Sequence, residues 1–509
     1  MYTRTMPSSA YVLAIDQGTT STRAILFDAS GRVQSTAQIE LSQHYPRPGW
    51  VEHDPEEIWQ SVVSTCREVV AAADGSIAAI GVTNQRETTV LWERATGVAV
   101  HNAIVWQDRR TVELCERWRT EGLAETVAQR TGLVIDPYFS ASKIRWLLDF
   151  VPGLRERAKA GEIAFGTIDS FLLWRLSAGR RHAIDATNAS RTMLFDIRRS
   201  GWDTDLLEAF GIPPAILPEV LDTGADYGAT TPELLGAAIP ITGMVGDQQA
   251  AMIGQACFRP GMIKSTYGTG AFALLNIGRE PAASRHRLLT TVAYRFGGES
   301  AYALEGSIFV AGAAVKWLRD RLGTIGAAAE AEGLAARADP QQRVYLVPGF
   351  AGLGAPYWSP QARGALIGLT AECGLPEIAR ATLEAVGYQT RDLVEAMAAD
   401  AEVAISTLRV DGGMAASDWT MQFLADILPA TVERPASIET TAWGAAYVAG
   451  LVRGIYPDPD TMVAQWLPER CFAPQMSPIE REERYTGWRR AITGVLVAAA
   501  PPASAKARS

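Results

Sequence analysis

One pattern occurs twice in the sequence and limits the folds that the chain can adopt. Apolar runs enclose a turn of small and hydroxyl residues at Tyr11–Asp28 (YVLAIDQGTTSTRAILFD), and a similar arrangement recurs at Met262–Ile277 (MIKSTYGTGAFALLNI). Each stretch is typical of a β-hairpin, because β-type residues flank a turn rich in glycine and threonine. One such turn is weak evidence for function. One in each half predicts two similar domains that each offer a phosphate loop to a shared cleft.

The first turn carries residue types that suit phosphate and magnesium. Its backbone N–H groups and hydroxyls can point at one small anion, and Gly18 lacks the side chain that would keep a phosphate away from the backbone. Asp16 could hold Mg²⁺ through waters, because Mg²⁺ prefers one or two carboxylates plus phosphate oxygens. On this stretch alone, an ordinary hairpin with a turn-forming aspartate is equally acceptable. The stretch contains neither GxxxxGK[ST] nor GxGxxG, so a phosphate site here would be of another kind.

Length and composition narrow the class of protein. A chain of 509 residues fits two large domains or about three smaller ones. The net charge of −9 argues against nucleic acid or an anionic membrane as the main partner. No apolar run approaches the roughly 20 residues of a membrane span, and we expect no signal peptide before Tyr11. Five scattered cysteines fit a reducing cytoplasm, and five unclustered histidines favour carboxylate chemistry.

A polar tetrapeptide, Asn84–Glu87, lies between two strand candidates at Ile77–Thr83 and Thr88–Trp92. Adjacent opposite charges at a loop tip are usually solvated surface. The functional alternative is a polyol site, because each hydroxyl needs a donor and an acceptor and Arg86 and Glu87 supply one of each. Such a site would reject analogues that lack a hydroxyl.

Asp247 follows a predicted strand, Ile241–Val245, and precedes a predicted helix. Aspartate at such a position is commonly a helix N-cap. The functional alternative is a catalytic base at the carboxyl edge of a sheet, where open α/β sheets bind their ligands. In the second half, the strand ending at Asp411-Gly412-Gly413 precedes a helix from Ser417 through Leu428, which suits a nucleotide's ribose or α-phosphate.

Several longer motifs together resemble those of the FGGY carbohydrate kinases, and they cover nearly the whole chain. They are DQGTTSTR at 16–23, TNQRETT at 83–89, NAIVWQDRR at 102–110, PYFSASK at 137–143, ATNASRTMLF at 186–195, GDQQAA at 246–251, YGTG at 267–270, GLGAPYW at 352–358 and DGG at 411–413. The resemblance implies an α/β fold of two actin-like domains of RNase H type, separated by a deep cleft. We place these domains at residues 1–253 and 254–509, with a disordered tail from about residue 501.

The resemblance also implies roles for individual residues. Glycerol would be bound by Arg86, Glu87, Tyr138, Asp247 and Gln248, with Trp106 and Phe272 against its carbon side. The phosphates and Mg²⁺ would be bound by Asp16, Thr19, Thr20, Ser21, Arg23 and Thr269, with Asp16 and Asp247 as the metal carboxylates. The nucleotide would lie near Gly312, Lys316, Gly413 and Ser417. Lys316 and Ser417 depart from the family, which commonly has Gln and Asn there.

The implied reaction is transfer of the γ-phosphoryl group of ATP, with Mg²⁺, to a terminal hydroxyl of glycerol, with Asp247 taking the proton. We also expect a cytoplasmic homo-oligomer, dimeric or tetrameric. Two alternatives remain open. One is a kinase for another small polyol or sugar. The other is an actin-like ATPase that forms filaments or acts as a switch, since fold alone does not fix function. The second alternative has no use for the Arg86–Glu87 pair.

Overall fold

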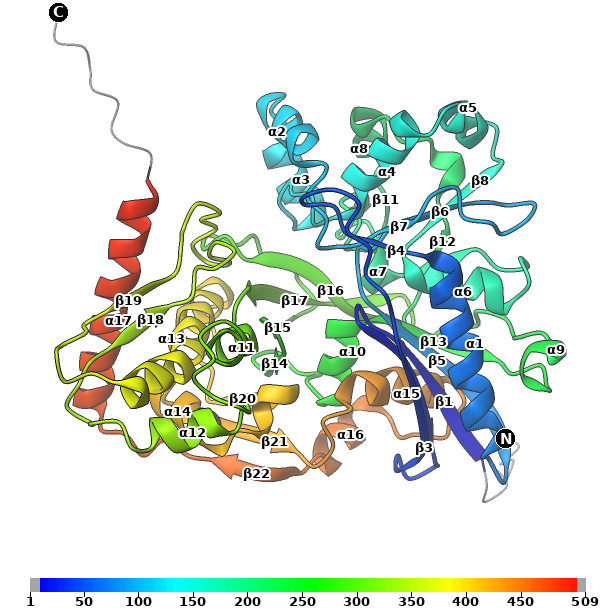
Figure 1. Cartoon of the computed structure of the whole chain (residues 1–509). Helices are drawn as coiled ribbons and strands as arrows, with labels where there is room; N and C mark the ends of the chain where they lie inside the picture. The colour runs from blue at the N-terminus through cyan, green and yellow to red at the C-terminus, as the bar shows by residue number, and fades with distance from the viewer. Residues whose placement is uncertain (1–9, 501–509) are drawn as a thin grey trace, which may run out of the picture.

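The first half of the chain is built on a five-stranded sheet (Figure 1). The structure is a computed structural model, and it describes residues 10–500. The strand order of this sheet is β13-β5-β1-β2-β3, in which β2 and β3 are antiparallel and β5 and β13 are parallel in their pairings. The strands are β1 (Ala10–Gln17), β2 (Ser21–Phe27), β3 (Val33–Glu40), β5 (Ser76–Asn84) and β13 (Ile241–Gly246).

The second half repeats the same arrangement inside a seven-stranded sheet. Its order is β16-β17-β15-β14-β20-β21-β22, and the central five strands reproduce the order and directions of the first sheet. The strands are β14 (Ile263–Tyr267), β15 (Ala271–Gly278), β16 (Leu289–Phe296), β17 (Glu299–Ile308), β20 (Thr407–Asp411), β21 (Thr431–Pro435) and β22 (Pro468–Phe472). The repeat confirms the two-domain α/β fold.

Both predicted hairpins are present at corresponding places in the two sheets. β1 pairs with β2 up to Gln17 and Thr22, and β14 pairs with β15 up to Tyr267 and Ala271. The turns are closed by Gly18 N–H to Ser21 O at 2.9 Å and by Gly268 N–H to Gly270 O at 2.8 Å. The first turn is shorter than the sequence suggested, because its last hydroxyl residues already belong to β2.

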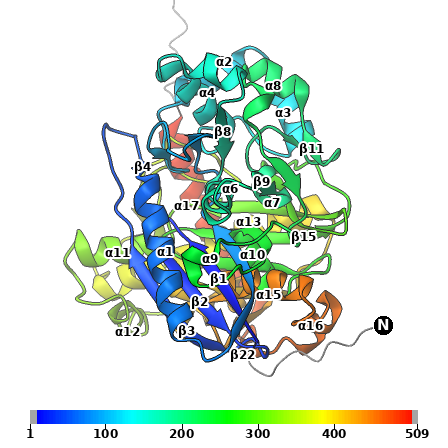
Figure 2. The ribbon, with the colours of Figure 1, turned by 90° about the vertical axis from the view of Figure 1, so that its right-hand side faces the viewer.

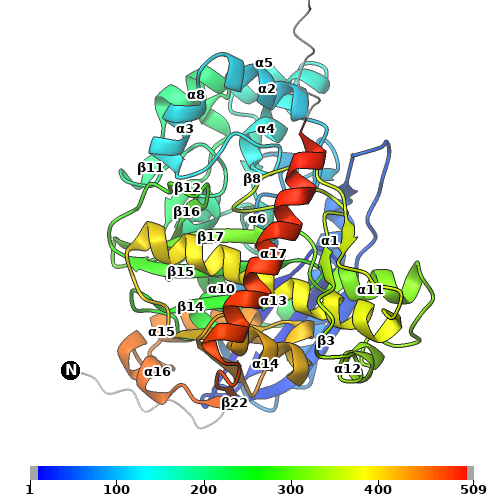
Figure 3. The same cartoon turned by 90° about the vertical axis from the view of Figure 1, so that its left-hand side faces the viewer.

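Long amphipathic helices cover the sheets. In the first half, α1 (Pro55–Ala71) buries one face against β1, β2 and β3 (Figure 2), and the Asp54 carboxylate caps its N-terminus by accepting from Glu56 N–H. In the second half, α13 (Leu375–Ala401) and α14 (Asp418–Ile427) pack on the sheet. The terminal helix α17 (Pro478–Ala499) crosses α13 (Figure 3), where Trp488 stacks on Tyr388 at 5.3 Å between ring centroids.

A helix from the second half completes the first domain. α15 (Thr440–Val452) packs on β1, β5 and β13 and against α10 (Asp247–Gly254), which also contacts β14 and β15 of the second sheet. The two helices touch backbone to backbone: a Cβ on Gly444 would lie 1.9 Å from Ala250 O, and one on Gly254 would lie 2.0 Å from Thr440 O. Glycine is therefore required at both positions, and the helix that begins at Asp247 is held between the two halves.

The other elements form a helical layer above the first sheet and shorter connections. The layer contains α2 (Val112–Thr120), α3 (Ala124–Thr131), α4 (Ser140–Phe150), α5 (Leu154–Lys159) and α8 (Thr204–Phe210), which share one apolar core. The connections are β4 (Glu52–His53), β6 (Val90–Glu93), β7 (Ala103–Ile104), β8 (Ile163–Gly166), α6 (Ile168–Leu176), β9 (Ala183–Asp185), α7 (Ala186–Ala189), β10 (Phe195–Asp196), β11 (Gly201–Trp202), η1 (Pro214–Ile216), β12 (Glu219–Leu221), α9 (Pro232–Leu235), α11 (Gly312–Asp320), α12 (Glu330–Ala335), β18 (Tyr345–Val347), β19 (Ala365–Ile367), η2 (Gly413–Ala416) and α16 (Pro459–Gln465).

Within residues 10–500, no helix combines the length and the apolar character that crossing a membrane requires. The tail predicted from about residue 501 lies outside the described residues. The domain boundary near residue 253 stays a prediction, although α15 places part of the second half against the first sheet.

Candidate active site

The Arg86–Glu87 loop is buried, so the solvated-surface interpretation of it is wrong. Arg86 is 2% exposed and Glu87 is 1% exposed, directly after β5. Glu87 has a φ of 60°, a left-handed conformation that costs a non-glycine residue about 1–3 kcal/mol and is concentrated at functional sites. Its backbone carbonyl accepts from the Ser140 hydroxyl at the start of α4, at 3.1 Å. The fold therefore holds this acid–base pair in a strained and fixed position.

The Arg86 guanidinium joins carboxylates from both halves of the chain. Its Nη1 and Nη2 donate to the two carboxylate oxygens of Glu305 in β17, at 2.5 and 3.1 Å. Its Nε lies 3.1 Å from Asp247 Oδ1. Arg191, just after α7, donates from Nε to Glu87 at 2.6 Å and from Nη2 to Glu305 at 2.9 Å. Burial alone would raise the pKa of Glu305, but Arg191 and Arg86 lower it to about 2.

Asp247 is the first residue of α10, and the N-cap position is taken by Gly246. The N-cap interpretation of Asp247 is therefore wrong, although its Oδ1 accepts from the next N–H, of Gln248, at 2.7 Å. Burial raises the pKa of Asp247, while the charges of Arg86 and Lys264 oppose that rise. A carboxylate with a raised pKa is a better proton acceptor than an ordinary aspartate. The position suits a general base.

Lys264 fixes the neighbouring amide. Its Nζ, from β14, donates to Gln248 Oε1 at 2.6 Å and to Thr266 Oγ1 at 2.9 Å. Burial lowers the pKa of Lys264 to about 8, while Asp411 and Asp247 oppose this shift. Because the ammonium occupies the amide oxygen, the Gln248 amide can offer its N–H groups to a ligand.

Three aromatic side chains lie next to the acid–base cluster and join it to the first hairpin. The Trp106 ring meets Tyr138 edge to face at 5.6 Å and Phe272 at 6.2 Å between centroids. All three are only partly buried, and Phe272 comes from β15 in the second half. The Trp106 indole N–H donates to Thr19 Oγ1 at 2.9 Å. An apolar wall therefore lies between the acid–base cluster and the turn predicted to bind phosphate. One hydrogen bond, from Trp106 to Thr19, connects the wall to that turn.

The first hairpin carries a buried carboxylate beside an arginine. Arg23 donates from Nη2 to Asp16 at 2.9 Å and from Nη1 to Glu439, which precedes α15, at 2.5 Å. Burial raises the pKa of Asp16 to about 6; Arg23 lowers it, and Asp247 and Glu439 raise it. The charge of Asp247 therefore acts on Asp16, which indicates that the two carboxylates share one electrostatic environment. Thr20 is exposed at the tip of the turn, and Ser21 is half-buried at the start of β2.

This donor set fits Mg²⁺ better than a metal that needs an all-protein cage. Residues 10–500 contain no group of three or more His, Cys, Asp or Glu side chains placed to hold a metal ion. Mg²⁺ keeps several waters and needs only one or two carboxylates when phosphate oxygens supply other ligands. Asp16 and Asp247 are the two carboxylates predicted to form such a pair.

The residues predicted to bind the nucleotide gather around the second hairpin. The first N–H groups of α11 donate to the turn, from Gly312 to Gly268 O at 3.0 Å and from Ala313 to Thr269 O at 3.0 Å. A Cβ on Gly312 would lie 2.6 Å from Gly268 O, so this glycine allows close backbone packing. Thr269 is exposed on the turn, like Lys316 on α11.

The other two nucleotide-side residues differ in their surroundings. A Cβ on Gly413 would meet no described atom within 4 Å, so this position is open to a ligand. The Ser417 hydroxyl caps α14 by accepting from Thr420 N–H at 3.1 Å, and it also hydrogen-bonds Thr420 Oγ1 at 2.7 Å. Helix capping is a sufficient structural reason for this serine.

Sequence reasoning missed three residues of the cluster: Arg191, Glu305 and Lys264. Arg191 lies in the motif at 186–195, to which the sequence analysis assigned no chemistry of its own. Glu305 lies in the interior of β17 and Lys264 is the second residue of β14, and both are buried. A buried charge in the middle of a strand must be paired, which is the signal that could have found them.

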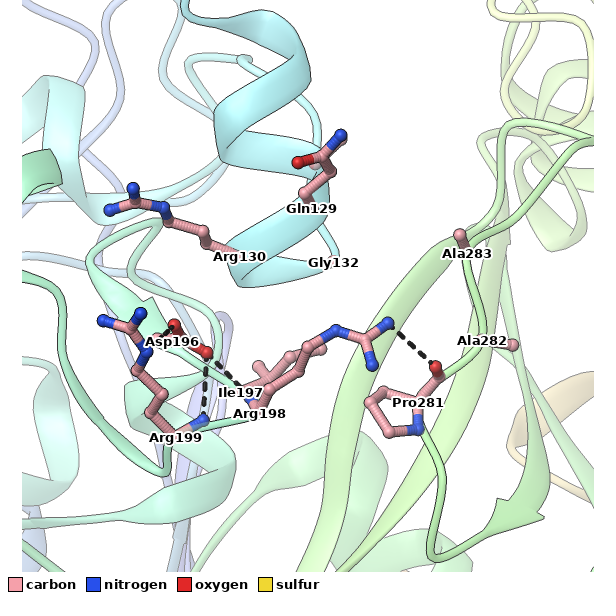
Figure 4. Close-up of a pocket in the computed structure, with 11 residues that line it drawn as sticks. Gln129, Arg130, Gly132, Asp196, Ile197, Arg198, Arg199, Pro281, Ala282 and Ala283 are labelled. Carbon is pink, nitrogen blue, oxygen red and sulfur yellow. Dashed lines mark hydrogen bonds and ion pairs between the residues drawn. The ribbon is translucent and has the colours of Figure 1, made fainter.

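A cavity of about 420 Å³ lies elsewhere, between α3, the turn after β10 and the loop after β15 (Figure 4). Arg198 reaches across it to Pro281 O at 3.2 Å, and Arg199 turns back to Asp196. None of the predicted site residues lines it.

The sequence comparisons agree with this architecture. The model of the N-terminal domain of the FGGY family of carbohydrate kinases matches residues 11–254, and that of its C-terminal domain matches residues 263–452. The chain belongs to this family. A glycerol kinase from Methylobacterium nodulans is 61% identical over 487 residues, covering 94% of this chain and 97% of that protein. A glycerol kinase from Bradyrhizobium diazoefficiens is 59% identical over 493 residues, covering 96% and 99%.

Solved structures show the same fold. Plasmodium falciparum glycerol kinase with ADP superposes with a TM-score of 0.91 at 34% identity, covering 96% of this chain and 98% of that one. Gluconate kinase from Lactobacillus acidophilus gives a TM-score of 0.88 at 21% identity, covering 96% and 98%, and that likeness concerns the fold alone.

Proposed function

We propose that this chain is an ATP-dependent kinase that phosphorylates glycerol to sn-glycerol 3-phosphate and so feeds glycerol catabolism. The glycerol kinases that are about 60% identical over nearly the whole chain support this substrate. The observation that carries the proposal is local. Buried Arg86 and Glu87, with the partly exposed Asp247 beside Arg86, adjoin an aromatic wall, and that wall is hydrogen-bonded to the hydroxyl-rich hairpin.

The acid–base cluster provides the chemistry that a triol requires. Arg86 and the Gln248 amide offer donors, while Glu87 and Asp247 offer acceptors. Tyr138 contributes a hydroxyl. Burial raises the pKa of Tyr138, so its O–H stays protonated and can donate. Trp106 and Phe272 cover the carbon side. A site with this many buried polar groups rejects an analogue that leaves one of them unpaired.

Transfer then requires the hydroxyl and the γ-phosphate in line. Asp247 accepts the proton of the terminal hydroxyl as its oxygen forms a bond to the γ-phosphorus, and the bond from that phosphorus to the β-phosphate oxygen breaks to release ADP. Phosphoryl transfer depends mainly on positioning and charge stabilisation. Correct alignment is worth about 7–11 kcal/mol, and a positioned base about 10²–10⁴ in rate.

The hairpins supply the phosphate side. Thr19, Thr20 and Ser21 of the first turn and Thr269 of the second offer hydroxyls and N–H groups. Arg23 would first release its two carboxylate partners, Asp16 and Glu439. Its guanidinium would then offset negative charge on the transferring phosphoryl group. Asp16 and Asp247 would hold Mg²⁺, which neutralises phosphate charge when bound. Gly312, Lys316, Gly413 and Ser417 would border the nucleotide.

We also propose that the enzyme works in the cytoplasm as a homo-oligomer. The scattered cysteines support the first proposal: Cys66, Cys115 and Cys257 are buried thiols without a disulfide in the described part of the chain.

The function is tested by a coupled ADP-release assay with ATP, Mg²⁺ and a panel of polyols. We expect the highest kcat/KM for glycerol, with tetritols and ketopentoses well below it. A higher kcat/KM for another polyol would identify that polyol, rather than glycerol, as the substrate. ADP release that is indifferent to every polyol would favour the actin-like ATPase.

A further inference from the structure

The carboxylate at the centre of the acid–base cluster comes from the second half of the chain, whereas Arg86 and Glu87 come from the first. Glu305 lies in the middle of β17, in the second sheet, and is 1% exposed. It accepts from both terminal nitrogens of Arg86, at 2.5 and 3.1 Å, and from Arg191 Nη2 at 2.9 Å. Arg86 follows β5 and Arg191 follows α7, so both arginines belong to the first half.

These contacts form an alternating chain of charges. It runs from Glu87 to Arg191 at 2.6 Å, to Glu305 at 2.9 Å, to Arg86 at 2.5 Å and to Asp247 at 3.1 Å. The polyol acceptor Glu87 stands at one end and the proposed base at the other. Glu305 is the middle member, and it is ionised at working pH because the two arginines hold its pKa near 2 against the effect of burial.

Each of the two arginines in this series of charges has one buried nitrogen without a hydrogen-bond partner among the described residues. Arg86 Nε and Arg191 Nη1 are buried and find no hydrogen-bond partner among residues 10–500. The contact of Arg86 Nε with Asp247 is close but lacks hydrogen-bond geometry. Proteins seldom leave buried donors unpaired, and beside a proposed polyol site a ligand oxygen is one acceptor that would pair them. Hydroxyl oxygens of a polyol are acceptors of the right kind.

We propose that Glu305 is a positioning residue for the polyol: it fixes the guanidinium planes of Arg86 and Arg191 so that their free nitrogens face the substrate hydroxyls. This inference rests on the proposed function. Glu305 itself does not touch the substrate. Because β17 supplies the carboxylate, the polyol site is complete only where the two halves meet.

Geometry explains why one carboxylate can set both groups. A guanidinium is a rigid planar fork, and a carboxylate that accepts from both of its terminal nitrogens fixes the plane as well as the position. Arg86 is fixed in this way by Glu305. For Arg191, Glu87 holds one edge and Glu305 the other. Without Glu305, the hydrogen bonds left to these guanidinium groups among the described residues are one from Arg86 Nη1 to Gln249 Oε1, at 3.1 Å, and one from Arg191 Nε to Glu87, so each plane can rotate about a single bond.

The test compares steady-state kinetics of Glu305→Gln and Glu305→Asp with the parent enzyme. We expect Glu305→Gln to raise the KM for glycerol by about tenfold or more, with the KM for ATP within about twofold. Selectivity for glycerol over 1,2-propanediol, which lacks one hydroxyl, should fall by a similar factor. Glu305→Asp keeps the charge but has a shorter side chain. Its KM for glycerol and its selectivity should lie between those of Glu305→Gln and those of the parent enzyme.

Glu384→Gln is the matched control. Glu384 is another buried carboxylate of the second half, and it accepts from two arginines, Arg380 at 2.8 Å and Arg484 at 3.2 Å. It lies on α13 and contacts none of the predicted site residues in the described structure. We expect its KM for glycerol and its selectivity to match the parent within about twofold.

The possible results separate the inference from the proposed function. An unchanged glycerol KM in Glu305→Gln, a parallel rise in the ATP KM, or an equal defect in Glu384→Gln overturns the positioning role. If Glu305→Gln fails to fold, Glu305→Asp carries the test alone: a raised glycerol KM with reduced selectivity supports the role, and parent-like kinetics overturn it. ADP release by the parent enzyme that is indifferent to glycerol overturns the proposed function instead.

Discussion

Gly444→Ala tests how tightly the helix that carries the proposed base is held. The new methyl group would lie 1.9 Å from Ala250 O, in the backbone of α10. Non-bonded carbon and oxygen atoms need more than 3 Å, so α10 and α15 must separate by about 1 Å. The obstacle is backbone, so no side-chain rotation can relieve it.

The size of the effect follows from that displacement. Overpacking costs about 1–3 kcal/mol, and the better helix propensity of alanine returns about 1 kcal/mol. Because the contact is rigid, we expect a cost in the upper part of the overpacking range. The net loss in the free energy of unfolding is then about 1–2 kcal/mol. In a domain of this size, each kcal/mol lowers the melting temperature by about 2–4 °C. Because α10 begins at Asp247, a shift of about 1 Å should also lower kcat by about 10²-fold.

Thermal unfolding and steady-state kinetics measure the two effects. Gly494→Ala is the control, because Gly494 lies in the helix α17 and a Cβ there would meet no described atom within 4 Å. That variant should be as stable as the parent or slightly more stable, with unchanged kcat. Gly444→Ala enzyme with the parent's melting temperature and kcat would refute the reasoning about α10 and α15.

Three further substitutions test individual roles. Asp247→Asn should lower kcat by about 10²–10⁴ while glycerol still binds, measured by kinetics and calorimetry; an unchanged kcat rejects the base. Glu87→Gln should raise the KM for glycerol more than that for ATP, and a change confined to ATP would contradict the polyol assignment. Because burial raises the pKa of Asp16 to about 6, the folded state binds a proton that the unfolded state releases between about pH 4 and 6, so stability falls as pH rises through that window. Asp16→Asn should remove that loss and unfold at a higher denaturant concentration than the parent above pH 6, without a gain at pH 4; equal midpoints at both pH values would contradict the shift.

The paired hairpins made the overall fold predictable from sequence. Apolar runs on both sides of a glycine-rich turn specify local pairing, and their recurrence indicates a duplicated domain. The order of the remaining strands did not follow from local pattern. Parallel neighbours such as β1 and β5 are joined through long connections, so their pairing depends on the whole core.

The candidate site was predictable where its residues lie in contiguous motifs. Arg86 and Glu87 are adjacent in sequence, and Asp247 follows a recognisable strand. The partner of Glu305 was not predictable, because Glu305 pairs with Arg86 across 219 residues of sequence. The sequence also could not distinguish a helix N-cap from a catalytic base at Asp247. The structure distinguishes them, because Gly246 occupies the N-cap position and Arg86 lies beside the Asp247 carboxylate.

Phosphorus NMR of the complete reaction tests the central claim most directly, because it reports where the γ-phosphoryl group goes. With ATP, Mg²⁺ and glycerol, we predict a new phosphate-monoester resonance, that of glycerol 3-phosphate, growing in equal amount with the resonances of ADP. Growth of inorganic phosphate in its place, at a rate independent of glycerol, would contradict the account.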